Sequence, residues 1–169
     1  GVQTCALPIS DVITADGDTQ ITPGEEVRVK GIGFVAGEAA VAQFAGVNVN
    51  TTGAPADEQG ALDVTFITPK LPANTYDLVV RAGAASASQS GIRVTGTITS
   101  AVMEGGSTGN IGALGTLLVV EGAGFDADAD VAFDIGTHTD IDTTHTTSEG
   151  TFRAGIVLRE LPDDLPEGT

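Results

Sequence analysis

Apolar and polar residues alternate along several short segments of the chain, and this period of two is the pattern of strands that bury one face. In the clearest case, Leu62, Val64 and Phe66 alternate with polar residues. Turn-forming stretches such as TPGE, VAGE and LPAN separate the segments, and no segment shows the apolar stripe of an amphipathic helix. The sequence therefore predicts an all-β fold. Its first strands are expected at residues 27–30, 41–44, 62–66, 76–81 and 92–94.

The same order of glycine, proline and apolar positions occurs twice along the chain. The segment PGEEVRVKGIGF resembles LGTLLVVEGAGF, and AVAQFAG resembles DVAFDIG. The matching segments are residues 23–34 with 114–125, 40–46 with 130–136, and 58–72 with 148–162. This self-similarity predicts an internal duplication, with a first repeat at 10–96 and a second at 97–169.

The second repeat ends at PEGT, whereas the first continues with YDLVV and a further strand. By this alignment the second repeat lacks its last strands and has an unpaired edge. Two explanations are open: truncation of a longer chain, or a groove that is completed by a strand from another subunit. Truncation is the simpler explanation, and strand donation stays open because an unpaired edge can recruit a strand.

The first nine residues, GVQTCALPI, have no periodicity or turn chemistry that links them to the rest of the chain. They resemble the translated sequence of a sequencing-library adapter. We therefore expect residues 1–9 to be a non-native leader. Cys5, the only cysteine, belongs to this leader. The remainder then offers no disulfide, thiol nucleophile or thiolate metal ligand.

The motifs of the two repeats are a G-x-GF turn, a GE pair before a strand, a D/E-x-G turn and, in the first repeat, LP-x-x-TYD. Together they resemble the bacterial and archaeal immunoglobulin-like surface repeats of the IPT/TIG type. The resemblance covers residues 10–169 and implies tandem immunoglobulin-like antiparallel β-sandwiches. It also implies a spacer or adhesive role at the cell surface or outside the cell. The partners would be neighbouring repeats and a cell-surface protein or glycan.

Seven residues of these motifs are expected to serve packing. Glycine permits positive φ where a strand leaves the sheet, and the phenylalanines are expected to close one end of each core. The tyrosine follows LPANT much as a tyrosine-corner residue follows an inter-sheet turn. These residues are Gly31, Gly33, Phe34, Tyr76, Gly122, Gly124 and Phe125.

The chain carries 23 acidic and 7 basic residues, which gives a formal net charge of −16. Such a surface repels phosphate backbones and anionic membranes, so we do not expect nucleic acid or an anionic membrane as a partner. The longest apolar stretch, LGTLLVVEGAGF, is too short to span a bilayer. We therefore expect no direct membrane insertion.

Two acidic stretches are candidate metal sites. Asp126, Asp128 and Asp130 alternate in a loop and could supply oxygens to Ca²⁺, although the glycine and the bidentate Glu of a calcium loop are missing. The stretch THTDIDTTH would place His138, Asp140 and Asp142 on one face of a strand, where one His and two carboxylates could hold a divalent transition metal. Solvated acids on a turn and on an outward strand face are the simpler interpretation of both.

No arrangement in the sequence indicates catalysis. Ser148 lies close to His145 in sequence, but nothing in the first repeat matches this pair. The G-x-GF turn lacks the helix that a phosphate-binding loop requires. We therefore expect a non-catalytic structural or adhesive module without a resident cofactor. The alternatives are an accessory module of a secreted polysaccharide-active enzyme, or a filament subunit completed by strand donation.

Overall fold

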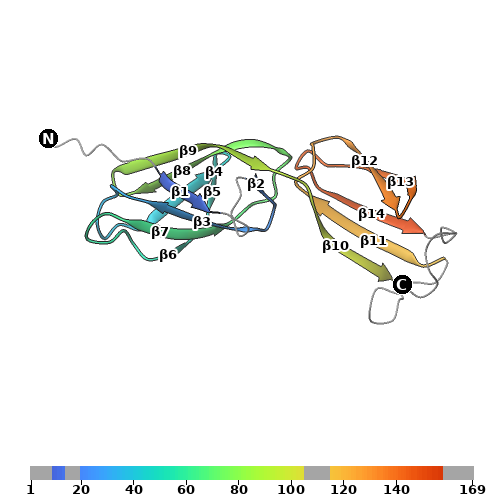
Figure 1. Ribbon diagram of the computed structural model, residues 1–169, viewed down its shortest axis with the longest axis horizontal. Helices are drawn as coiled ribbons and strands as arrows, with labels where there is room; N and C mark the ends of the chain where they lie inside the picture. The colour runs from blue at the N-terminus through green and yellow to red at the C-terminus, as the bar shows by residue number, and fades with distance from the viewer. Residues whose placement is uncertain (1–8, 14–19, 105–114, 158–169) are drawn as a thin grey trace. The chain divides into compact units, whose positions relative to one another are not determined.

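The structure, a computed structural model, describes residues 9–13, 20–104 and 115–157 (Figure 1). These residues form strands and no helix, so the prediction of an all-β fold is confirmed. Within these ranges no helix is long and apolar enough to cross a bilayer. The chain divides into two compact units. Unit 1 contains the described residues up to Lys70 together with Asn74–Thr95, and unit 2 contains Leu71–Ala73 and the described residues from Gly96 onward.

Unit 1 consists of two sheets, with strand orders β1-β3-β7-β6 and β2-β9-β8-β4-β5. Neighbouring strands are antiparallel, except that β2 runs parallel to β9. The first sheet contains β1 (Ile9–Ile13), β3 (Glu26–Gly31), β7 (Leu62–Ile67) and β6 (Thr51–Gly53). The second contains β2 (Gln20–Ile21), β9 (Ala85–Val94), β8 (Asn74–Ala82), β4 (Ala40–Phe44) and β5 (Val47–Val49).

The core of unit 1 forms from the alternating apolar residues that the sequence pattern identified. In β7, Leu62, Val64 and Phe66 are buried while the intervening Asp63 is exposed. The ring of Phe66 lies 5.9 Å from the ring of Phe44 in β4, which belongs to the other sheet. The two sheets of unit 1 therefore share one core.

Unit 2 has a three-stranded sheet of order β10-β11-β14 and a two-stranded sheet of β12 and β13. Its strands are β10 (Thr97–Glu104), β11 (Leu117–Ala123), β12 (Asp130–Ile135), β13 (His138–His145) and β14 (Phe152–Val157). The ring of Phe152 lies 5.1 Å from Phe125 and 5.5 Å from Phe133, in edge-to-face arrangements. With Val120 and Ile156, these rings make a small aromatic core.

The sequence repeat is present in the structure as the same strand pairing. In unit 1, β3 pairs with β7 from Gly31 opposite Leu62. In unit 2, β11 pairs with β14 from Gly122 opposite Phe152, which are the aligned positions. Because side chains alternate between faces, the same register buries the same aligned positions in both units.

One part of the sequence alignment is wrong by one residue. The β4–β5 hairpin closes with Phe44 opposite Val47, and the β12–β13 hairpin closes with Ile135 opposite His138. Phe44 therefore corresponds to Ile135, whereas matching AVAQFAG with DVAFDIG places it on Asp134. That alignment matched the turn glycines of the two hairpins, but these occupy different turn positions.

A glycine holds the G-x-GF turn of each unit. The amide of Phe34 donates a 3.1 Å hydrogen bond to the carbonyl of Gly60, and the amide of Phe125 donates an equal bond to Gly150. Both glycines have positive φ, +77° and +66°. A Cβ on Gly60 would lie 2.5 Å from the carbonyl oxygen of Phe34. A side chain at position 60 would therefore push the Gly60 turn away from the G-x-GF turn of the same unit.

A cross-strand charge pair occurs in both units with its signs exchanged. Lys30 lies opposite Asp63 in unit 1, and Glu121 lies opposite Arg153 in unit 2, with a 3.0 Å ion pair. Asp63 also accepts a 2.6 Å hydrogen bond from Nε of Arg28. This bond lowers the pKa of Asp63 below its ordinary value.

We expect Gly60→Ala to lower the unfolding free energy of unit 1 by more than an alanine placed at positive φ without a steric clash would. Gly91→Ala is the matched control, because Gly91 has φ +83° but nothing within 4 Å of its added Cβ. The control should lose about 1–2 kcal/mol of unfolding free energy, and Gly60→Ala at least about 1 kcal/mol more. Tyr76, the only tyrosine in a chain without tryptophan, makes urea unfolding followed by fluorescence specific to unit 1. Equal losses would contradict the importance of the Phe34 contact.

We expect Asp63→Asn to destabilise unit 1 at neutral pH and to matter less in acid. A carboxyl whose folded-state pKa is lowered stabilises the fold above its unfolded-state pKa of about 4, and this contribution disappears as pH falls through the folded-state value. Glu58→Gln, in an exposed loop, controls for the loss of one negative charge. Urea unfolding at a series of pH values should show the two variants converging below about pH 4. A pH-independent difference would rule out the Arg28 contact as its cause.

Candidate functional site

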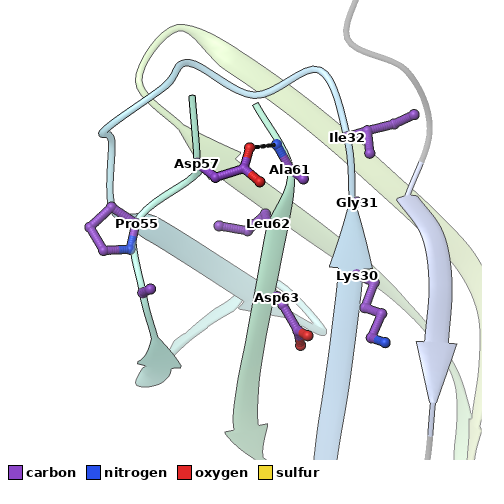
Figure 2. Close-up of a pocket in the computed structure, with 9 residues that line it drawn as sticks. Lys30, Gly31, Ile32, Pro55, Asp57, Ala61, Leu62 and Asp63 are labelled. Carbon is purple, nitrogen blue, oxygen red and sulfur yellow. Dashed lines mark hydrogen bonds between the residues drawn. The ribbon is translucent and has the colours of Figure 1, made fainter. Parts of the chain in front are cut away.

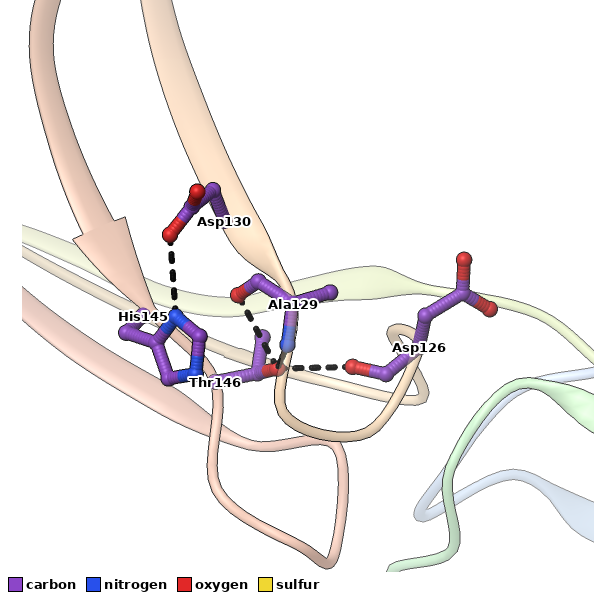
Figure 3. Close-up of polar contacts among 5 residues, drawn as sticks. All are labelled: Asp126, Ala129, Asp130, His145 and Thr146. Atoms are coloured by element: carbon purple, nitrogen blue, oxygen red, sulfur yellow. Dashed lines mark hydrogen bonds and ion pairs between the residues drawn. The ribbon is translucent and has the colours of Figure 1, made fainter.

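The aspartate triplet lies in the loop between β11 and β12 (Figure 3). Asp126, Asp128 and Asp130 are all exposed. Asp128 has φ +51°, and the aligned residue of unit 1 is Gly37, with φ +77°. Aspartate is among the few non-glycine residues that adopt this conformation readily. The loop geometry therefore gives Asp128 a conformational role that needs no ion.

The carboxylate of Asp130 faces a histidine rather than the other two aspartates. Its Oδ1 lies 2.9 Å from Nδ1 of His145, which is its cross-strand partner in β13 (Figure 3). Across the described ranges no group of three or more His, Cys, Asp or Glu side chains is placed to hold a metal ion. The triplet is therefore not assembled as a calcium site, and calcium binding stays a prediction from the sequence.

A buried threonine holds the triplet loop in place. The side-chain oxygen of Thr146, a residue only 2% exposed, accepts a 2.8 Å hydrogen bond from the Ala129 amide and donates a 2.7 Å bond to the Asp126 carbonyl (Figure 3). The backbone amide of Thr146 donates to the Ala129 carbonyl. In unit 1 the corresponding residue is Ala56, which has no side-chain hydroxyl and makes backbone contacts: its amide donates to the Glu38 carbonyl and its carbonyl accepts from the Gly37 amide. Sequence reasoning missed Thr146, because one threonine among many in THTDIDTTHTT carries no signal of burial.

The second predicted metal group, in β13, is interrupted by the backbone. Asp140 has φ +56°, and the register of β12 with β13 shifts between Phe133 and Ile135. The Asp140 amide donates to the Asp134 carboxylate. Strict alternation would put His138 and Asp142 on the face of Asp140, and a left-handed residue between them breaks that alternation. The expectation of three ligands on one regular strand face is therefore wrong.

Ser148 and His145 have different partners in the structure. The Ser148 hydroxyl bonds to Glu149, and this bond, together with one from Thr147, lowers the pKa of the Glu149 carboxyl. His145 faces Asp130. The Ser148 hydroxyl thus pairs with a carboxylate in its own turn, and His145 pairs with Asp130, so the structure gives the two residues separate partners.

The motif glycines have two different roles. Gly33 and Gly124 have positive φ, +86° and +78°, as expected. Gly31 and Gly122 do not, because they lie inside β3 and β11, so the expectation for these two is wrong. At Gly122, an added Cβ would collide with the Phe152 ring. This glycine provides space for an aromatic side chain.

The aromatic residues of the motifs lie in or against the cores of the two units. Phe34 is 6% exposed and Phe125 is half-buried. The Tyr76 ring lies 5.8 Å from the Phe44 ring, and burial raises the pKa of Tyr76. A bond from its hydroxyl to the backbone, as in a tyrosine corner, stays a prediction.

Unit 1 has a shallow groove of about 410 Å³ beside the end of β3 (Figure 2). Exposed Ile32 and Pro55 lie on its sides, with Lys30 and Asp63 at one end. The carboxylate of Asp57 accepts hydrogen bonds from the Gln59 and Ala61 amides and so closes its own loop. The Asp57 carboxylate is therefore bonded to backbone amides, and the groove is a surface feature between loops.

No protein-family model matches this chain, and a search of curated proteins finds no significant match. The resemblance to IPT/TIG repeats therefore stays a prediction from the sequence motifs.

We expect Asp128→Gly to raise the unfolding free energy of unit 2 by up to about 1 kcal/mol, because glycine adopts positive φ without steric cost. Asp128→Val should lower it, because a β-branched residue fits this conformation poorly. Urea unfolding followed by circular dichroism measures both, as a transition that Tyr76 fluorescence does not report. Millimolar Ca²⁺, the working range of weak extracellular sites, should shift neither. Stabilisation of the parent by Ca²⁺ that Asp128→Gly abolishes would establish the calcium site instead.

Proposed function

We propose that this chain is a non-catalytic structural or adhesive repeat module of a secreted or cell-surface protein, built from immunoglobulin-like units of the IPT/TIG type. The observation that carries the proposal is the repetition of one all-β unit with the same strand register and the same phenylalanine–glycine turn. In arrays of such repeats, length and repeated surface carry the function. A module of this kind spaces or presents other parts of a larger protein.

The aromatic residues favour this role over carbohydrate binding, the main alternative. An accessory module of a polysaccharide-active enzyme would offer exposed rings on which sugars stack. All seven aromatic residues of the chain lie in the described ranges, and none is exposed. Phe125 and Tyr76 are half-buried and the other five are buried. The rings are used in the cores.

The surface charge agrees with an extracellular module. A net charge of −16 keeps a protein soluble and repels nucleic acids and anionic membranes. The partners in this proposal are neighbouring repeats of the same protein and a protein or glycan at a cell surface.

Stretching the chain by atomic force microscopy between two marker domains tests the structural role. Two force peaks are expected, one for each unit, and each should lengthen the chain by about 3.4 Å for every residue released. Gly60→Ala should lower the force of one peak only, because the replaced turn belongs to unit 1.

Extension without force peaks would contradict a mechanical role. Saturable retention of the chain on insoluble polysaccharide, by contrast, would favour the accessory-module alternative over the structural one.

A further inference from the structure

One asparagine of unit 1 begins a tripeptide of the kind that receives N-linked sugars. The chain contains four asparagines, and only Asn50 has a serine or threonine two positions later, in Asn50-Thr51-Thr52. The pattern N-x-S/T, with any residue except proline in the middle, is the acceptor sequence for N-glycosylation. Such a tripeptide also arises by chance in a segment rich in Asn and Thr. Its position in the fold is therefore the deciding observation.

Asn50 lies between β5 and β6, where the chain passes from one sheet of unit 1 to the other. Its neighbours Val49 and Thr51 are each paired across a sheet, whereas Asn50 has no cross-strand partner among the described residues. The strands β5 and β6 are each the last strand in the order of their sheet. The asparagine therefore lies at an open side of the unit and outside both strand ladders.

The middle residue of the tripeptide is anchored, and the outer two are exposed. Oγ1 of Thr51 donates a 2.9 Å hydrogen bond to the carbonyl of Ala40 in β4. Successive side chains of a strand point to opposite faces, so Thr52 points away from β4. Asn50 and Thr52 are both exposed. The two side chains that define the acceptor sequence are thus accessible together in the folded unit.

The side chain of Asn50 also differs from those of the other described asparagines in having no hydrogen-bond partner among the described residues. Oδ1 of Asn48 accepts a 2.9 Å hydrogen bond from the Gln43 side chain. Oδ1 of Asn74 accepts a 2.8 Å bond from the next backbone amide. A substituent on Asn50 would therefore replace no contact of the fold.

We propose that Asn50 is the acceptor of an N-linked glycan. The donor class is an oligosaccharide linked to a lipid through pyrophosphate, and a separate transferase catalyses the reaction. A bond forms between Nδ2 of Asn50 and the anomeric carbon of the first sugar, and the bond from that carbon to the pyrophosphate oxygen breaks. The amide nitrogen loses one proton, and the lipid pyrophosphate leaves. The inference rests on the proposed secreted or cell-surface location, because this transfer acts on chains that cross a membrane.

A glycan at this position would cover the outer edges of two sheets. Exposed strand edges can recruit strands of other molecules, and proteins prevent this by covering such edges. An N-linked glycan is bulky and solubilising. Attached between β5 and β6, it would hinder pairing at both edges at once.

The test uses the folded full chain, a purified single-subunit oligosaccharyltransferase that recognises N-x-S/T, and a lipid-linked oligosaccharide. Mass spectrometry of the intact chain and of its peptides should show one glycan per chain, on the peptide that contains Asn50. Asn50→Gln and Thr52→Ala should each abolish the addition, whereas Thr52→Ser, which keeps the hydroxyl, should retain it. Asn48→Gln is the matched control and should be modified as the parent is, because Asn48 is exposed in the same segment but does not begin the tripeptide.

The free peptide VNVNTTGAP, residues 47–55, is the reference substrate under the same conditions. A modified peptide beside an unmodified chain would overturn the proposal, because the fold would then hide the acceptor. Modification of neither, or equal modification of the parent and Asn50→Gln, would overturn it as well. Circular dichroism of each variant, unchanged from the parent, ensures that a lost glycan reflects the acceptor and not the fold. The structural role is tested separately by the stretching experiment, so its failure is distinguishable from failure of this inference.

Discussion

The register between β3 and β7 in unit 1, and between β11 and β14 in unit 2, is the constraint on which the remaining contacts depend. In both units the pairing runs from the motif glycine, Gly31 or Gly122, opposite the first residue of the next paired strand. A slip of one residue would turn every core side chain outward. The turn bonds from Phe34 to Gly60 and from Phe125 to Gly150 lie just beyond these strands and hold the register at one end. The burial of the aromatic cores depends on this register.

The two units fill their cores with different side chains. Where unit 1 has Leu62, unit 2 has Phe152, and where unit 1 has Ala42, unit 2 has Phe133. The larger rings fill space in a unit whose described strands form smaller sheets. They fit because Gly122 has no side chain that would meet Phe152. Gly122 therefore has two roles: its backbone pairs with Phe152 across the sheet, and its lack of a side chain leaves space for the Phe152 ring.

The sequence predicted the all-β class and the alternating core of β7 correctly, since the period of two depends only on local order. It failed where tertiary packing decides. The alignment of β4 was wrong by one residue because it matched the turn glycines. Gly122 leaves space for the Phe152 ring and does not have positive φ. Asp140 has positive φ and interrupts the predicted metal-binding face of β13. The buried hydroxyl of Thr146 could not be distinguished from its exposed neighbours, because burial of one threonine depends on a distant loop.

The exchanged charge pair has a consequence for how tandem units fold beside each other. Adjacent repeats of similar sequence can trade strands while folding and become trapped in mixed structures. If β3 of unit 1 paired with β14 of unit 2 in the shared register, Lys30 would face Arg153. The reciprocal mixture would set Glu121 against Asp63. Like charges opposite each other destabilise a strand pair, so the exchanged signs disfavour pairing between strands of different units.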